Sequence, residues 1–272
     1  MVCALEEVLK KPIIQEENPN WSVEEFGKIL KEVIENYVNE CFSLNQGVIY
    51  TTLSGGIDSS LCLAIIRETL GNSVEIHTFT VGGYSQHPDL VFARMVAEQF
   101  ETNHHELIPS RQMIGEASRE LKMVFPRISE KEIQENLGVY FAYDLISQKV
   151  PEFSIVIAHD GIDELLGGYW KHRASDDLAK KKVAFNDFWE KLRPEHIDPL
   201  MQIASSMGLG VAFPYLDSRV VEYISRIPVQ ERTSHEISKI PLRKIASKYL
   251  PKEIIKRQKL GFCDAISREV HQ

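Results

Sequence analysis

Residues 54–60 read Ser-Gly-Gly-Ile-Asp-Ser-Ser and lie between two apolar runs, 48–53 and 61–66. This order is typical of a strand, a tight glycine turn and the start of a helix. Such a turn brings unpaired backbone N–H groups to the positive end of a helix dipole, which favours a bound phosphate. Gly55 and Gly56 allow the backbone to approach an anion closely. The segment therefore predicts a phosphate-binding loop.

The polar side chains of the loop agree with this interpretation. The hydroxyls of Ser54, Ser59 and Ser60 can donate to phosphate oxygens, and the Asp58 carboxylate can share a Mg²⁺ with them. The alternative is an ordinary Gly-Gly turn with Asp58 as a helix cap, but that alternative leaves the serines unexplained.

Composition narrows the class of protein. The chain has 272 residues, 43% of them hydrophobic and 26% charged, as is usual for a globular enzyme. Its formal net charge of −8 argues against general nucleic-acid binding. The four cysteines are far apart and form no CxxC pair, which favours unpaired thiols in a reducing compartment. We find no signal peptide and no apolar run of about 18 residues, so we expect a cytoplasmic chain without a membrane segment.

The hydrophobic pattern alternates between strands and helices. We expect strands over 48–53, 75–81, 105–108 and 154–158, with intervening helices, a helix over about 22–44, and a helical C-terminal part from about residue 172. This alternation predicts an α/β fold with a doubly wound, mostly parallel sheet. We expect five strands in this sheet, of which these four can be located in the sequence. We divide the chain into 1–46, a polar arm followed by a helix, and 47–272, one domain that contains all of these strands and the helical C-terminal part.

A second polar segment follows the last of these strands. Residues 158–169 read Ala-His-Asp-Gly-Ile-Asp-Glu-Leu-Leu-Gly-Gly-Tyr, with acids at 160, 163 and 164. Crowded carboxylates repel unless a cation neutralises them. An acidic helix start explains one such acid, not all three. Ligands of parallel sheets bind beyond the carboxyl ends of the strands, so we expect this segment to lie beside the Ser54 loop.

The loop resembles the SGGxDS pyrophosphate loop of the ATP pyrophosphatase superfamily, and residues 160–169 resemble the DGxDELFGGY segment of the asparagine synthetase family. Further segments resemble that family in order along residues 45–265. They are 79–82, 89–106, Pro214-Tyr215-Leu216-Asp217, Lys239 with Leu242-Arg243, and Arg257 to Phe262.

The resemblance implies an adenine nucleotide α-hydrolase-like fold and ATP-dependent adenylation of a substrate carboxylate. Pyrophosphate leaves, and ammonia or another amine then forms an amide and releases AMP. The resemblance also implies particular roles for single residues. Asp58 and Asp163 become Mg²⁺ ligands, and Asp160, Lys239 and Lys259 become catalytic, with Lys259 over the β and γ phosphates. The implied nucleotide-binding set is Leu53, Ser54, Gly55, Gly56, Asp58, Ser59, Ser60, Val81 and His159.

The chain also departs from the family pattern. Ala158-His159 replaces Ser-Gly, and we expect His159 to act either as a base for the amine or as a hydrogen-bonding group that fills space. Ala212 stands where the family has arginine, which puts aspartate as the acceptor in question. Val2 precedes Cys3, and only about 45 residues precede the loop, so we expect no glutaminase domain.

Several alternatives and partners stay open at this point. The alternatives are an amide or lactam synthetase acting on a different acid and a non-catalytic ATP-binding subunit. An NAD synthetase shares the loop, but residues 163–169 favour the asparagine synthetase side. The partners that we expect are a small carboxylic acid and ammonia or an amine, and a separate glutaminase or amidase subunit and a homodimer are compatible with the sequence.

Overall fold

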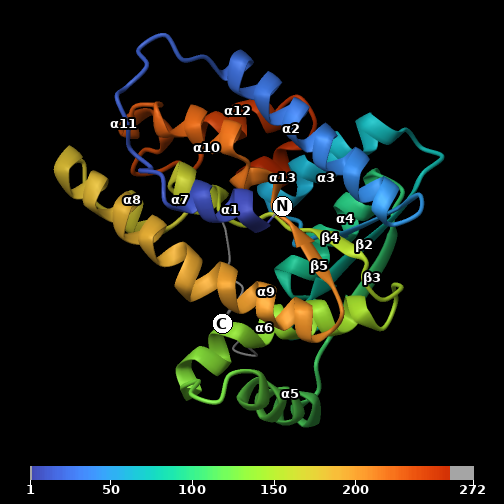
Figure 1. Ribbon diagram of the computed structural model, residues 1–272. Coiled ribbons are helices and arrows are strands. Elements are labelled where there is room, and N and C mark those ends of the chain that lie inside the picture. Colours follow the sequence, from blue (N-terminus) through green and yellow to red (C-terminus); the bar gives the residue numbers. More distant parts are fainter. Residues whose placement is uncertain (1, 258–272) are drawn as a thin grey trace.

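A parallel five-stranded sheet forms the centre of the computed structural model, which describes residues 2–257 (Figure 1). The strands are β1 (Val48–Thr52), β2 (Glu75–Val81), β3 (Asn103–Leu107), β4 (Ile155–Ile157) and β5 (Gly210–Ala212), in the order β3-β2-β1-β4-β5. β1 pairs with β2 on one side and with β4 on the other. The strand order therefore reverses at β1, and the expected doubly wound α/β fold is confirmed.

Helices cover both faces of the sheet. α2 (Val23–Leu44), α3 (Ile57–Leu70) and α4 (Pro88–Gln99) lie on one face, while α6 (Glu130–Ser147) and α9 (Asp198–Ser206) lie on the other (Figure 1). α5 (Arg111–Val124) packs beside α6 and α9. A parallel sheet buried on both faces needs apolar strands, and residues 155–157 read Ile-Val-Ile.

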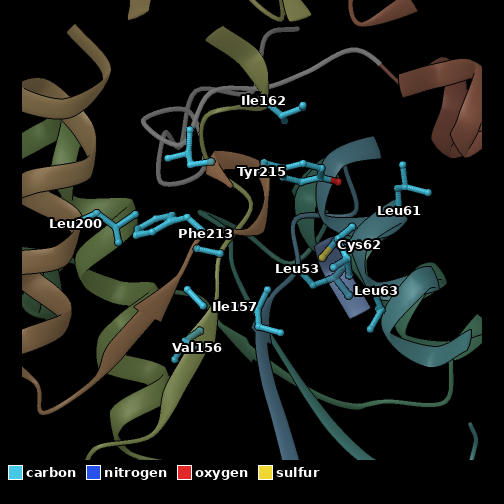
Figure 2. Close-up of a cluster of buried hydrophobic side chains, with 14 of the residues drawn as sticks. Leu53, Leu61, Cys62, Leu63, Val156, Ile157, Ile162, Leu200, Phe213 and Tyr215 are labelled. Atoms are coloured by element: carbon cyan, nitrogen blue, oxygen red, sulfur yellow. The ribbon is translucent and has the colours of Figure 1, made fainter. Parts of the chain in front are cut away.

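Local sequence signals set the helix boundaries. The Ser22 hydroxyl accepts a hydrogen bond from Glu25 N at 3.1 Å and starts α2. Ser129 and Glu132 form a reciprocal capping box at the start of α6. Side chains from β1, α3, β4 and the segment after β5 then join one hydrophobic cluster, which includes Leu53, Cys62, Ile157 and Phe213 (Figure 2). The strand ends thus rest on packed apolar side chains.

The structure differs from the sequence prediction in three places. Helix α1 (Val2–Leu9) occupies the segment expected to be a polar arm, and Ile13 beyond it is buried. β3 begins at Asn103, two residues before the expected strand. β5 lies within the part expected to be helical, because three residues are too few to show strand periodicity. The division at residue 46 stays a prediction.

The remaining elements follow β4, and all of them except α8 have eight residues or fewer. They are α7 (Ile162–Leu166), η1 (Trp170–His172), α8 (Leu178–Leu192), η2 (Arg193–Ile197), η3 (Pro214–Leu216), α10 (Ser218–Ser225), α11 (Val229–Arg232), α12 (Ile240–Ala246) and α13 (Lys252–Lys256).

Candidate functional site

The loop after β1 is held tightly by its own hydroxyls. Ser54 N donates to Ser59 Oγ at 3.2 Å, and Gly56 N donates to Ser54 Oγ at 3.3 Å. Gly55 has a φ of +65°, and a Cβ built there would lie 2.4 Å from Ala93 N in α4. Glycine is therefore required at this position, both for the backbone conformation and for the close approach of α4.

The loop leads into the N-terminus of the 14-residue helix α3. Gly56 is the N-cap and supplies no side-chain acceptor, so the first-turn N–H groups lack a capping side chain. Ser60 Oγ is buried and has no hydrogen-bond partner within residues 2–257. Together with the dipole of α3, these donors suit an anion at the carboxyl edge of the sheet.

Two acids from distant parts of the sequence meet on one lysine. Lys239 Nζ lies 2.5 Å from Asp58 Oδ2 and 2.7 Å from Asp163 Oδ1. The lysine side chain is only 2% exposed, so the three charges interact in a place with little water to screen them. The structure thus brings Asp58, Asp163 and Lys239 of the implied site together.

Backbone features place this lysine and make room for it. Lys239 has a φ of +54°, an uncommon conformation for a residue other than glycine, and its N–H donates to Leu166 O at the end of α7 at 3.1 Å. A Cβ built on Gly168 would lie 1.6 Å from Asp163 Oδ1 and 2.8 Å from Lys239 Cε. Gly168 therefore provides the space in which the acid and the lysine meet.

Other residues of the 160–169 segment support its shape. Tyr169 Oη donates to Glu164 Oε1 at 2.8 Å, and the Tyr169 ring stacks on Phe188. Gly167 ends α7 in the left-handed conformation. Of the three acids, Glu164 is therefore engaged by Tyr169, whereas Asp163 contacts Lys239.

His159 lies over the end of β1. Its Nε2 is 2.9 Å from Thr52 O and 2.9 Å from Thr51 Oγ1. Because a carbonyl oxygen can only accept, Nε2 carries the proton. Burial lowers the pKa of His159 to about 4, so the ring is neutral near pH 7. This arrangement supports the hydrogen-bonding alternative for His159 over the role of base.

Asp160 has a partner that the sequence did not reveal. Asp160 Oδ1 lies 2.6 Å from His196 Nε2. His196 belongs to η2, a wide helical turn in which Asp198 N donates to Arg193 O, five residues earlier. Pro194 in an otherwise helical stretch marks this turn, because proline lacks the N–H of a regular helix. That proline was the available signal, although it does not name the acid that His196 meets.

Two C-terminal side chains hold the loop in place. Tyr215 Oη donates to Asp58 O at 2.8 Å. Arg257 donates to Ser54 O at 2.6 Å, pairs with Asp89, and has its guanidinium 4.9 Å from the centre of the Phe92 ring. Tyr215 and Arg257, each from a segment that carries the family resemblance, thus both reach the loop.

The other expected site residues fall in two groups. Leu53 and Val81 are buried at the same carboxyl edge, where Thr80 Oγ1 donates to Leu53 O. Lys259 lies outside the described residues.

Within residues 2–257, no three His, Cys, Asp or Glu side chains gather so as to hold a metal ion. The donor set still fits Mg²⁺, because that ion commonly takes one or two carboxylates and completes its shell with phosphates and water.

The fold and the site together define an α/β protein with a glycine-rich loop, of a kind suited to an anion, at the switch point of its sheet. A family model described as asparagine synthase matches residues 30–199 and 187–272. The chain belongs to this family.

Curated relatives agree with the family. The chain is 29% identical over 231 residues to the glutamine-hydrolysing asparagine synthetase of Gallus gallus. This alignment covers 79% of this chain and 39% of the relative. It is 28% identical over 257 residues to asparagine synthetase B of Escherichia coli (strain K12), with coverages of 87% and 44%. The chain thus spans less than half the length of these relatives.

Solved structures are more distant. An NH3-dependent NAD synthetase from Campylobacter jejuni superposes with a TM-score of 0.38 at 19% identity, covering 55% of this chain and 61% of that one. An NAD+ synthetase from Burkholderia pseudomallei superposes with a TM-score of 0.38 at 11% identity, with coverages of 90% of this chain and 93% of that one.

In the described part of the chain, no helix is long and apolar enough to cross a membrane.

Proposed function

We propose that this chain is an ATP-dependent ligase of the asparagine synthetase type, which adenylates a small carboxylic acid and then joins it to ammonia or another amine. The observation that carries the proposal is the meeting of Asp58 and Asp163 on Lys239, beside the Ser54 loop. Asp58 and Asp163 would hold Mg²⁺, which would offset negative charge on the ATP phosphates. We propose cytoplasm as the place of the reaction.

Most of the catalysis would consist of positioning and charge stabilisation. The loop N–H groups and the hydroxyls of Ser54, Ser59 and Ser60 would hold the pyrophosphate part of ATP, with the adenine near the backbone of Val81. The substrate carboxylate attacks the α-phosphate, and the α–β bond breaks to release pyrophosphate. Lys239 would keep the two acids in place, and Asp160 would accept a proton from the attacking amine. Lys259 would face the leaving pyrophosphate.

A related amide or lactam synthetase acting on another acid is the second candidate. Ala212 favours this candidate, because the family resemblance implies an arginine at that position. Ala212 is buried at the end of β5, next to β4. His159 beside the strand end is a further change near the place of the acyl group.

The test is pyrophosphate and AMP release by purified protein with ATP, Mg²⁺, ammonia and a panel of amino-acid carboxylates that begins with L-aspartate. Release that depends on one acid supports the ligase and names its substrate. Asp58→Asn should abolish release without unfolding the protein. No pyrophosphate from any acid would instead favour a non-catalytic ATP-binding subunit.

A further inference from the structure

His196 and Asp160 form a close pair whose members differ in exposure. The Asp160 side chain is 15% exposed and that of His196 is 34% exposed, while 2.6 Å separates Oδ1 from Nε2. Asp160 follows β4 at the carboxyl edge of the sheet, and His196 comes from the covering helical segment. Asp160 is therefore the inner member of the pair, and His196 is the member that is more open to solvent.

The surroundings keep Asp160 in this position. Gly161 has a φ of +93°, and a Cβ there would lie 2.2 Å from Leu216 Cδ2, so the chain turns sharply after Asp160. The buried Tyr143 side chain lies close enough to Asp160 for the carboxylate to raise its pKa further, after the larger effect of burial. Tyr143 Oη has no hydrogen-bond partner within residues 2–257, so its hydroxyl does not compete with His196 for Asp160.

We propose that His196 is a positioning and proton-relay residue that acts through Asp160 in the amine step. This inference rests on the proposed function and adds to it the route by which the proton leaves. The amine nitrogen forms a bond to the acyl carbon of the adenylate, the C–O bond to AMP breaks, and AMP takes that electron pair. The nitrogen loses one proton to the Asp160 carboxylate. In the resting pair, His196 Nε2–H donates to the Asp160 carboxylate. After Asp160 has taken the amine proton, exchange with water moves the ring proton of His196 from Nε2 to Nδ1. Asp160 then passes its proton to the Nε2 lone pair, and His196 releases the Nδ1 proton to water.

His159 is less suited than His196 to pass a proton from Asp160 to water. Its Nε2 proton is held by Thr52 O, and its Nδ1 is buried without a hydrogen-bond partner within residues 2–257. His196 has one nitrogen on Asp160 and an imidazole ring one-third open to water. Of these two histidines at the site, His196 is the one placed to exchange protons with solvent.

The test separates the two half-reactions in His196→Gln. Glutamine can donate an N–H to Asp160 but cannot accept and release a proton. Acyl-adenylate formation, measured by ATP–pyrophosphate exchange without amine, should stay within about twofold of wild type, because no amine proton moves in that step. Ammonia-dependent AMP release should fall at least about tenfold, because loss of the relay removes part of the rate gain that general-base catalysis supplies. Added imidazole should restore part of the AMP release in His196→Ala.

His77→Gln is the matched control. His77 Nε2 lies 2.8 Å from Glu75 Oε1, so it is also a histidine paired with a carboxylate, but at the amino end of β2. Both half-reactions should be unchanged in this variant.

The outcomes are distinct. Normal AMP release by His196→Gln, or equal losses in exchange and in AMP release, would overturn the relay while leaving the proposed function intact. Absence of exchange in wild type with every acid of the panel would overturn the proposed function and the relay with it.

Discussion

Lys239 is the residue on which two distant segments converge. Asp58 lies in the first turn of α3 and Asp163 in the first turn of α7, and the two carboxylates share one ammonium group. One positive charge between two acids leaves a net negative site, which suits a further cation. Lys239 pays a conformational cost of roughly 1–2 kcal/mol for its left-handed backbone, so the surrounding contacts must hold it there.

Lys239→Met should destabilise the protein by about 3–5 kcal/mol, because removing one partner of a buried ionic cluster leaves buried charge without compensation. Urea unfolding near pH 7 measures the change. Lys244→Met in α12, the helix that begins directly after Lys239, is the control. Lys244 is exposed, so this change should shift stability by less than about 0.5 kcal/mol. Equal effects of the two substitutions would contradict the role of Lys239.

His159 should make stability depend on pH. Its folded-state pKa of about 4 is below the ordinary 6.5, so between these values the unfolded chain binds a proton that the folded chain does not. Stability is therefore lost as pH falls from about 6.5 to about 4, by at most about 3 kcal/mol.

The measurement compares wild type with His159→Gln by denaturant unfolding at pH 7 and pH 4.5. Wild type should lose more stability on acidification than the variant, which has no titrating ring. The same loss in both proteins would show that His159 is not held neutral.

At the scale of elements, the turn after α7 decides whether the acids can meet. The turn is built from Gly167 in the left-handed conformation and Gly168 against Asp163 and Lys239. The double glycine of this segment is thus explained by one backbone requirement and one steric requirement. Neither depends on a ligand.

Gly168→Ala should be strongly destabilising and should displace Asp163, because its Cβ would lie 1.6 Å from Asp163 Oδ1. Gly115→Ala in α5 is the matched control. Nothing lies within 4 Å of a Cβ there, and alanine should stabilise the helix by up to about 1 kcal/mol. Thermal unfolding of both variants measures the contrast, and a wild-type melting temperature for Gly168→Ala would refute it.

Local sequence patterns made much of the fold and part of the candidate site predictable. The strand–turn–helix order placed the Ser54 loop, and the parallel sheet placed Asp58 and Asp163 at one edge, because each inference needed only neighbouring residues and a topological rule. β5 was not predictable, since three residues carry no periodicity. The Asp160–His196 contact was not predictable either, because it joins residues 36 positions apart and depends on how the wide turn at Pro194 directs a side chain.

At the scale of the whole molecule, the N-terminal segment is part of the packed structure. Gln15 N donates to Ser225 O at 3.0 Å, and Trp21 Nε1 donates to Glu231 Oε2 at 2.9 Å. The fully buried Arg232 donates to Ile13 O, to Leu165 O in α7 and to two carbonyls near its own helix. One guanidinium thus joins the beginning of the chain to the segment that carries Asp163.

Arg232→Met should cost about 3–5 kcal/mol, because several buried carbonyls lose their donor together. Arg219→Met on α10 is the control, since the Arg219 side chain is 48% exposed, and it should cost less than about 1 kcal/mol. Urea midpoints measure both changes. A small effect of Arg232→Met would mean that the N-terminal segment is held by its other contacts.

The meeting of Asp58, Asp163 and Lys239 also has a consequence for biosynthesis. The two acids are made before the lysine that neutralises them, because Lys239 stands 76 positions after Asp163. At about 5–20 residues per second, the nascent chain spends roughly 4–15 s with both carboxylates made and their counter-ion still untranslated. The sheet can complete its strands in that interval, because β5 ends at Ala212, whereas the charged centre closes only after Lys239 has been made.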